Sequence, residues 1–378
     1  MSVFGGYGPG GGESLPRVLR LGLRVAGGNR FLCSLHEEGT GLSWQYDARL
    51  SDRAEERLVA EARTLQAWSI GREASRARAQ QALDGIGRSL HRSFLGRRGE
   101  EYLARMRPTA MLLDVDETIL SLPWELMHGW GGPLVTQLPV GRVAATRTVP
   151  HAERDPLAQD REVRVLAVSD PTADLALAAA EVAALQAVGS RATGGYSVHV
   201  DVLEGGDARL AAFTEAIAQR DYDILHFAGH AGFHAARPGE SRLHFADGQM
   251  HADQVRSLPW PSPPGIVFAS ACESAAVRRG ARLVSRRRGS NGLAAAFLSA
   301  GVGGYLGYLW PVSDEGAGLV AGTFYEALFQ RENVGLAVLE ARRAAAAQLG
   351  DSLDLAAYSF VLYGDAASKH RRDLATAH

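Results

Sequence analysis

The sequence predicts a three-layer α/β sandwich built on a mostly parallel β-sheet. After residue 162, short apolar runs bounded by turn residues alternate with helical patterns of about 12–16 residues. Such alternation is typical of strands joined by right-handed helical crossovers, which make neighbouring strands parallel. The chain of 378 residues can bury a large core, and its 46% hydrophobic and 22% charged residues are ordinary for a globular protein.

The N-terminal part begins with a glycine-rich stretch at residues 1–15, which has too few apolar groups to pack, and we expect it to be a disordered tail. Alternating apolar residues between 16 and 46 then predict two strands joined by a glycine-rich turn. A helical stretch follows from Ser51 to about Leu95, with a break near Gly71.

Residues 109–120 contain an Asp-x-Asp-x-Thr motif that resembles the first motif of haloacid-dehalogenase-type phosphatases, with Asp114 as nucleophile and Asp116 as acid. That chemistry needs Mg²⁺ held by further carboxylates and a cation that balances the phosphoryl charge. The only lysine is Lys369 near the C-terminus, although an arginine could replace it, and no downstream pair of acidic residues makes a convincing Mg²⁺ site. We therefore favour a hairpin with solvated acidic residues at its turn, followed by a short buried helix at 122–126.

A polar, proline-containing stretch at residues 147–162 is the best candidate for a linker, and the regular alternation begins after it. The expected strands are residues 163–168, 196–203, 221–228, 266–271 and 302–310, and the expected helices are 173–188, 207–219, 293–300, 314–330 and 333–349.

Two reactive side chains follow strands in this part of the chain. His230 comes after the strand at 221–228 and Cys272 after the strand at 266–271. In open parallel sheets, functional groups collect at the carboxyl ends of strands. A thiol with a pKa of about 8.5 becomes a good nucleophile when an imidazole lies nearby. The alternative is structural, with Cys272 a small buried apolar residue and His230 a core histidine.

Three histidines, His226, His230 and His234, are spaced four residues apart, as in some zinc sites. Glycines interrupt the segment and a strand precedes it, so the three rings would not share a helix face. We expect no metal here, a core position for His226 and no assigned role for His234.

Five segments resemble the motifs of CHAT domains, the caspase- and separase-like cysteine peptidases of bacteria. They are the histidine motif at residues 226–232, the cysteine motif at 270–274, the Pro-Trp-Glu segment at 122–126, the Leu-Trp-Pro segment at 309–314, and the helical segment at 324–328 with 337–343 behind it. The resemblance spans residues 16–365. The sequence departs from the usual pattern at Ala231, where glycine is commoner.

The resemblance implies a caspase-like fold with a non-catalytic N-terminal half at residues 16–150, a catalytic half at 160–365 and a C-terminal tail at 366–378. It also implies cleavage of peptide bonds by a Cys–His dyad, without a cofactor. Cys272 would be the nucleophile and His230 the general base and acid. The backbone N–H groups of Ala231 or Gly232, and of Cys272, would bind the oxyanion.

Asp314 falls where separases carry an aspartate that reads the P1 residue. The resemblance therefore implies that Asp314 faces the S1 pocket and favours a basic P1 residue. The alternative, which does not exclude the first, is that Asp314 is the N-cap of the helix at 315–330.

An arginine-rich loop follows Cys272. Caspase relatives carry processing or activation loops in this region, so autocleavage or binding of an activator is one interpretation, beside a solvated loop. Nucleic acid is a third, although a formal net charge of −2 argues against a dedicated nucleic-acid binder. The arginines are Arg278, Arg279, Arg282, Arg286, Arg287 and Arg288.

Cellular context follows from what the sequence lacks. The two cysteines give neither a disulfide framework nor metal-ligand spacing. There is no signal-peptide pattern, and no apolar run reaches the roughly 18 residues of a membrane span, so we expect a cytoplasmic protein that does not bind membranes. The resemblance implies a protein substrate, such as a gasdermin-like pore former, and an upstream activator, in bacterial defence or programmed cell death. An inactive adaptor with the same fold is the alternative.

Overall fold

The computed structural model describes residues 17–41, 43–71, 76–116, 119–120, 122–129, 131–143, 162–175, 177–191, 197–234, 237–271, 274, 292–330, 333–348 and 355–367. The expected disordered tail at residues 1–15 lies outside them, as do nearly all of the expected linker and C-terminal tail.

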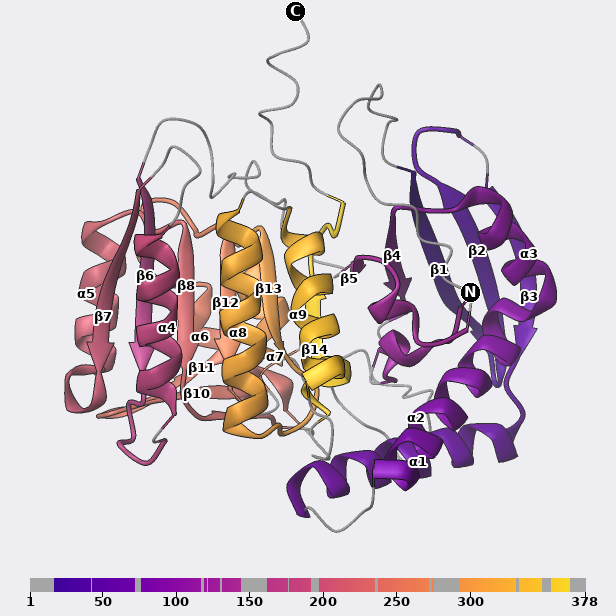
Figure 1. Ribbon diagram of the computed structural model, residues 1–378, viewed down its shortest axis with the longest axis horizontal. Helices are drawn as coiled ribbons and strands as arrows, with labels where there is room; N and C mark the ends of the chain where they lie inside the picture. The colour runs from indigo at the N-terminus through magenta and orange to yellow at the C-terminus, as the bar shows by residue number, and fades with distance from the viewer. Residues whose placement is uncertain are drawn as a thin grey trace, which may run out of the picture.

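A single large sheet runs through the described part of the chain (Figure 1). Its eleven strands lie in the order β3 (Ser43–Arg49), β2 (Arg30–Glu37), β1 (Val18–Gly27), β4 (Ala110–Val115), β5 (Val140–Arg142), β14 (Phe360–Tyr363), β13 (Gly304–Tyr308), β12 (Ile266–Ser270), β8 (Ile224–Ala228), β6 (Val163–Ser169) and β7 (Val198–Glu204). Only the pairings β1–β2, β2–β3 and β13–β14 are antiparallel. The predicted mostly parallel α/β sheet is therefore confirmed.

Helices cover both faces of this sheet and make the three expected layers (Figure 1). One face packs against α4 (Ala178–Ser190), α8 (Asp314–Phe329), α9 (Val334–Gln348) and α10 (Ala356–Ser359). The other packs against α1 (Asp52–Gly71), α2 (Arg76–Leu90), α3 (Gly96–Met106), α5 (Leu210–Gln219), α6 (Ala252–Val255) and α7 (Gly292–Ser299). Each face has its own apolar core, because successive side chains of a strand point to opposite faces.

The N-terminal half contains the predicted β1–β2 hairpin, in which alternate residues of β2 are buried. Strand β3 extends this hairpin to the sheet edge and was not expected from the sequence. The predicted helical stretch with a break is present as α1 and α2, and α2 continues through a π-helical turn, η1 (His91–Leu95), into α3.

The segment around Asp114 differs from the predicted hairpin. Strand β4 pairs in parallel with β1 on one side and with β5 on the other. Its apolar residues are buried on both faces, which is typical of a parallel strand inside a sheet rather than of a hairpin at its surface. The short buried helix predicted after it is confirmed as the 3₁₀ turn η3 (Trp124–Leu126).

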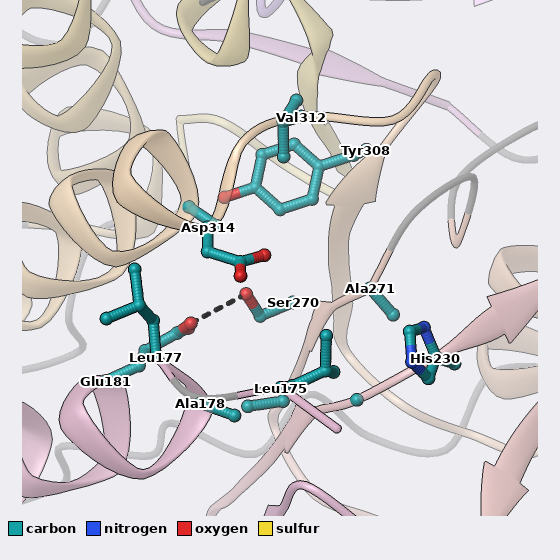
Figure 2. A pocket seen from close by; sticks show the side chains of 13 residues that line it. Leu175, Leu177, Ala178, Glu181, His230, Ser270, Ala271, Tyr308, Val312 and Asp314 are labelled. Carbon is teal, nitrogen blue, oxygen red and sulfur yellow. Dashed lines mark hydrogen bonds between the residues drawn. The ribbon is translucent and has the colours of Figure 1, made fainter. Parts of the chain in front are cut away.

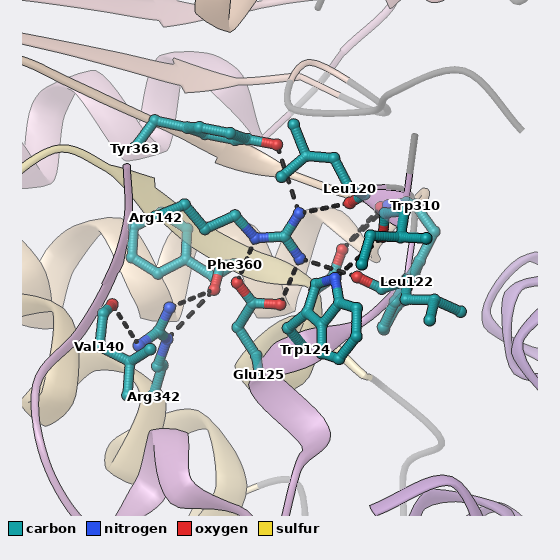
Figure 3. Close-up of polar contacts among 12 residues, drawn as sticks. Leu120, Leu122, Trp124, Glu125, Val140, Arg142, Trp310, Arg342, Phe360 and Tyr363 are labelled. Carbon is teal, nitrogen blue, oxygen red and sulfur yellow. Dashed lines mark hydrogen bonds and ion pairs between the residues drawn. The ribbon is translucent and has the colours of Figure 1, made fainter. Parts of the chain in front are cut away.

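A buried ion pair lies where the two halves of the sheet meet (Figure 3). The Arg142 guanidinium on β5 binds both carboxylate oxygens of Glu125 at 2.6 and 2.5 Å, and both side chains are at most 1% exposed. Arg142 also donates to the carbonyl oxygens of Leu120 and Leu122, so each of its three guanidinium nitrogens donates a hydrogen bond. Beside β5, β14 carries Tyr363, whose ring lies under the guanidinium, 5.6 Å from its centroid.

Strands β6, β8, β12 and β13 run in the same direction, so their carboxyl ends lie at one edge of the sheet. The expected neighbourhood of the histidine and cysteine strands is confirmed, because β8 pairs directly with β12 and Ala228 lies opposite Ser270.

The predicted helix at 173–188 begins later than expected, at Ala178. Residues 170–175 instead form a turn in which Asp170 and Ala173 adopt left-handed backbone angles, with φ of 42° and 56°. A small antiparallel sheet, also not expected, follows β8 and consists of β9 (Ala231–Gly232), β10 (Arg242–Phe245) and β11 (Gly248–His251).

Candidate active site

A pocket of about 210 Å³ opens at the carboxyl ends of β8, β12 and β13. Its lining includes His230 and residues just past these strand ends, together with the first turns of helices α4 and α8. Figure 2 shows Asp314 and Glu181 reaching toward it from the two helices, Ser270 between them, and His230 on the far side of Ala271. Parallel strand ends and helix starts therefore converge on one cavity.

His230 lies two residues past the end of β8 and is partly open to solvent, with 40% of its side chain exposed. Its Nε2 atom lies 3.0 Å from Oδ1 of Asp174, in the turn between β6 and α4. On another side the His244 ring of β10 lies 6.5 Å away, centroid to centroid. Burial lowers the pKa of His244, and the charges of Arg242 and His230 lower it further. The predicted core alternative for His230 is thus wrong, since the ring is neither buried nor packed in the sheet.

Cys272 lies outside the described residues, but its neighbours on both sides are described. Ala271 is buried at the end of β12, and its carbonyl accepts a hydrogen bond from the Ser274 N–H at 3.2 Å. The buried Ser274 hydroxyl in turn donates to Ala269 O at 2.9 Å and accepts from the Tyr308 N–H at 3.1 Å. Ala271 and Ser274 thus both lie at the carboxyl ends of β12 and β13. The six arginines from Arg278 to Arg288 also lie outside the described residues.

Asp314 is the first residue of α8 and lines the pocket. The N-cap of this helix is not Asp314, as the alternative had it, but Ser313, whose hydroxyl accepts the Gly316 N–H at 3.0 Å. The Asp314 carboxylate is therefore not used as the cap.

Glu181 supplies a second carboxylate to the pocket and was not singled out from the sequence. It is 7% exposed, and its Oε2 accepts a hydrogen bond from the Ser270 hydroxyl at 3.0 Å. Its Oε1 lies 3.3 Å from Nε2 of His226, whose Nδ1 contacts the Tyr325 hydroxyl at 3.0 Å. No arginine or lysine lines the pocket in the part of the chain that the structure describes.

The other two histidines of the motif have separate surroundings. His226 is fully buried between the sheet and α8, as expected for a core residue. The Nδ1 atom of His234 accepts the Arg237 N–H at 3.0 Å, at the start of the loop before β10. Among the described residues, no group of three His, Cys, Asp or Glu side chains is arranged to hold a metal ion.

Asp114, the nucleophile of the phosphatase interpretation, forms ion pairs with Arg24 at 2.7 Å and Arg20 at 3.9 Å. Asp116 lies at the end of the same strand, 3.4 Å from the Val25 N–H. Two guanidinium groups occupy the carboxylate that would have to bind Mg²⁺ and attack phosphorus, so this edge of the sheet does not fit the phosphatase mechanism.

The sequence analysis also missed Asp174. The signal that was available is Asp170-Pro171-Thr172-Ala173-Asp174, a run of turn-forming residues directly after a strand. Because the expected helix began at residue 173, Asp174 was ascribed to it and was not recognised as a side chain that follows a strand end, where functional groups gather.

Within the described residues, no helix has both the length and the apolar character that crossing a membrane would demand. Comparison with curated protein sequences finds no match.

The matches to solved structures include the following two. The Saccharomyces cerevisiae separase–securin complex matches with a TM-score of 0.57 and 13% identity over 92% of this chain, which spans only 30% of the separase chain. The Drosophila initiator caspase Dronc matches with a TM-score of 0.33 and 8% identity, over 60% of this chain and 91% of its own. The first match confirms the expected separase-like α/β fold. A family model for the CHAT domain matches residues 84–371, about three quarters of the sequence, and the chain therefore belongs to the CHAT domain family.

Proposed function

We propose that this protein is a cysteine endopeptidase in which Cys272 is the nucleophile and His230 the general base and acid. The observation that carries the proposal is the direct pairing of β8 with β12, in which Ala228 lies opposite Ser270. His230 lies two residues past one of these positions and Cys272 two residues past the other. A thiol and an imidazole that follow adjacent strand ends are suited to nucleophilic catalysis.

In the proposed reaction His230 takes the proton of the Cys272 thiol, and the thiolate attacks the carbonyl carbon of the scissile bond. The C–N bond then breaks as His230 returns the proton to the leaving amine. Water, deprotonated by His230, finally hydrolyses the thioester and releases the carboxylate product.

Of the N–H groups expected to bind the oxyanion, that of Ala231 fits better than that of Gly232. The His244 N–H donates to the His230 carbonyl at 3.0 Å, and Gly232 pairs with Arg242. Because hydrogen-bonded and non-hydrogen-bonded pairs alternate in antiparallel strands, the Gly232 N–H faces β10 and the Ala231 N–H faces away from it. The Cys272 N–H would be the second donor.

We further propose that the pocket is the S1 site and that it binds a basic P1 side chain. Asp314 and Glu181 both line it, and no arginine or lysine among the described lining residues neutralises them. A guanidinium or ammonium group would bring the missing positive charge and hydrogen-bond donors.

The resemblance to CHAT peptidases also supports a proposal for the substrate and the cellular process. The substrate would be a specific protein, such as a gasdermin-like pore former, cleaved in the cytoplasm during bacterial defence or programmed death and under the control of an activator. The separase of the similar structure is itself bound to another protein, securin.

The test is hydrolysis of a fluorogenic peptide library that varies the P1 residue, followed by co-expression with a gasdermin-like protein. We expect Cys272→Ala and His230→Ala each to lower kcat by about 10³-fold or more. Cys33→Ala is the matched control, because Cys33 is fully buried in the N-terminal half and burial raises its thiol pKa to about 12. Equal hydrolysis by wild type and Cys272→Ala would contradict the proposal, and binding without cleavage would favour the adaptor.

A further inference from the structure

We propose that Asp174 is a positioning residue whose carboxylate orients the His230 ring, so that the proposed dyad works as a Cys–His–Asp triad. This inference rests on the proposed function. It starts from the hydrogen bond between His230 Nε2 and Asp174 Oδ1, which is 3.0 Å long. With Nε2 turned to Asp174, the other ring nitrogen, Nδ1, is left to exchange a proton with the thiol.

The turn between β6 and α4 is built to present this carboxylate. The Asp170 carboxylate accepts hydrogen bonds from the backbone N–H groups of Asp174 and Leu175, at 3.0 and 3.1 Å. These bonds connect the first residue of the turn to its last two. The Thr172 hydroxyl donates to Oδ1 of Asp174 at 2.5 Å, on the same oxygen that faces His230. The Asp170 side chain thus fixes the backbone of Asp174, and the Thr172 and His230 side chains both contact its Oδ1 atom.

The backbone of this turn is strained at two positions. Asp170 and Ala173 adopt φ of 42° and 56°, a region that non-glycine residues occupy at a cost. Strain of this kind persists where the surroundings over-determine it, and it is commonest at functional sites. Here its structural effect is to delay the start of α4 until Ala178, so that Asp174 stays beside the end of β8.

The neighbouring strand leaves room for the turn. The Asp170 N–H donates to Ala228 O at 2.9 Å, which ties the turn to β8. A side chain at Gly229 would lie 2.8 Å from the Phe227 ring and 3.1 Å from Pro171, closer than such atoms normally approach. The glycine before His230 therefore lets the turn and the histidine come together.

Electrostatics agree with this arrangement. Hydrogen bonds from Thr172 and then from His230 hold the pKa of Asp174 below its ordinary value. The carboxylate is therefore ionised at neutral pH, and it places a negative charge 3.0 Å from the His230 ring. His244 of β10, itself beside Arg242, is the other titratable ring near His230, and its lowered pKa keeps it neutral there. Asp174 thus contributes the nearest opposite charge among the described neighbours of His230.

The test is the rate at which iodoacetamide alkylates Cys272 between pH 5 and 9, followed by mass spectrometry. In wild type we expect fast alkylation well below the ordinary thiol pKa of about 8.5, because the imidazolium stabilises the thiolate. Asp174→Asn should slow this low-pH reaction by about tenfold. Replacement of a buried triad aspartate lowers kcat by roughly 10⁴-fold. We expect a smaller effect here because the side chains of His230 and Asp174 are both open to water.

Two further readouts separate positioning from a merely structural role. Asp174→Asn should lower kcat for a basic-P1 peptide with little change in KM, because the His230 ring loses the side chain that orients it. Asp174→Glu should restore part of the rate. Asp207→Asn, at another exposed aspartate, is the control and should match wild type.

The outcomes distinguish the two proposals. If Cys272 is alkylated fast at low pH in wild type and equally fast in Asp174→Asn, Asp174 does not position His230, although the proposed Cys–His dyad stands. If wild-type Cys272 reacts only with the pH profile of an ordinary thiol, the proposed dyad fails and this inference fails with it.

Discussion

At the residue scale, the proposed S1 specificity depends on two carboxylates that line the pocket. Asp314 approaches from α8 and Glu181 from α4, and they differ in their surroundings: Asp314 is exposed at the start of its helix, whereas Glu181 is held by Ser270 and lies 3.3 Å from His226. The buried carboxylate is pre-organised, so it can bind a cation without paying for side-chain ordering.

At this scale we expect both carboxylates to control the preference for arginine over leucine at P1. Asp314→Asn and Glu181→Gln should each lower kcat/KM for an arginine peptide by about 10–100-fold, the effect of losing a charge-assisted hydrogen bond of about 1.5–3 kcal/mol. Glutamine at 181 can still accept the Ser270 hydroxyl, so the fold should be preserved. Peptidase assays with matched arginine and leucine peptides measure the ratio.

Glu315→Gln is the control for this prediction, because Glu315 neighbours Asp314 on α8 but does not line the pocket. An unchanged arginine-to-leucine ratio in both pocket variants would rule out the proposed S1 site.

The sequence was informative about the proposed dyad and less so about the other side chains of the candidate site. His230 and Cys272 are recognisable because each follows an apolar strand and is flanked by small residues. Asp174 and Glu181 precede His230 by 56 and 49 positions, and only the pairing of β6 with β8 brings their loop and helix to the site. Such long-range contacts depend on strand order, which local patterns do not specify.

At the scale of elements, long periodic segments were predicted well and short ones were missed. Helices α8 and α9 and strands β6 to β8 lie close to the expected positions. Strands β9, β10, β11 and β14 have two to four residues each, too few for a periodic signal. Strand β4 was mistaken for a hairpin arm because its burial on both faces comes from neighbours that lie far away in the sequence.

Helix α2 offers a test of packing between elements, because two of its glycines differ in their surroundings. A Cβ atom at Gly87 would collide with the His128 ring and the Leu126 carbonyl, whereas one at Gly85 would lie 3.5 Å from the Glu61 carboxylate, an ordinary contact. Gly87→Ala should therefore destabilise the protein by about 1–3 kcal/mol through overpacking, despite the better helix propensity of alanine.

Gly85→Ala, the matched control two residues away, should be neutral or stabilising by up to about 1 kcal/mol. Urea unfolding measures both. Equal stabilities for the two variants would show that α2 does not pack against the segment after η3 as closely as described.

At the scale of the whole molecule, the sheet passes without a break from the N-terminal half to the C-terminal half of the described chain. The connection is the pairing of β5 with β14, and the buried Glu125–Arg142 pair lies beside it. Arg342 of α9 reinforces this region by donating to the carbonyl oxygens of Phe360 and Val140, one on each strand (Figure 3). Buried arginines thus hold the two halves together through backbone carbonyls.

We expect Glu125→Gln to lower the free energy of unfolding by about 3–5 kcal/mol, because it leaves the fully buried Arg142 guanidinium without a counter-ion. Glu101→Gln is the control, since Glu101 and Arg97 form an ion pair with side chains 58% and 91% exposed. That substitution should change the stability by no more than about 0.5 kcal/mol. Chemical denaturation measures both, and similar values would refute a structural role for the buried pair.

The position of β14 has a consequence for the timing of synthesis. This strand is the last described one in the sequence, yet it lies in the interior of the sheet between β5 and β13. Residues 360–363 are synthesised after His230 and Cys272, so the position between β5 and β13 cannot be filled until then. We therefore expect the eleven-stranded sheet, including the strand that flanks β13, to be completed only after nearly all of the described chain has been synthesised.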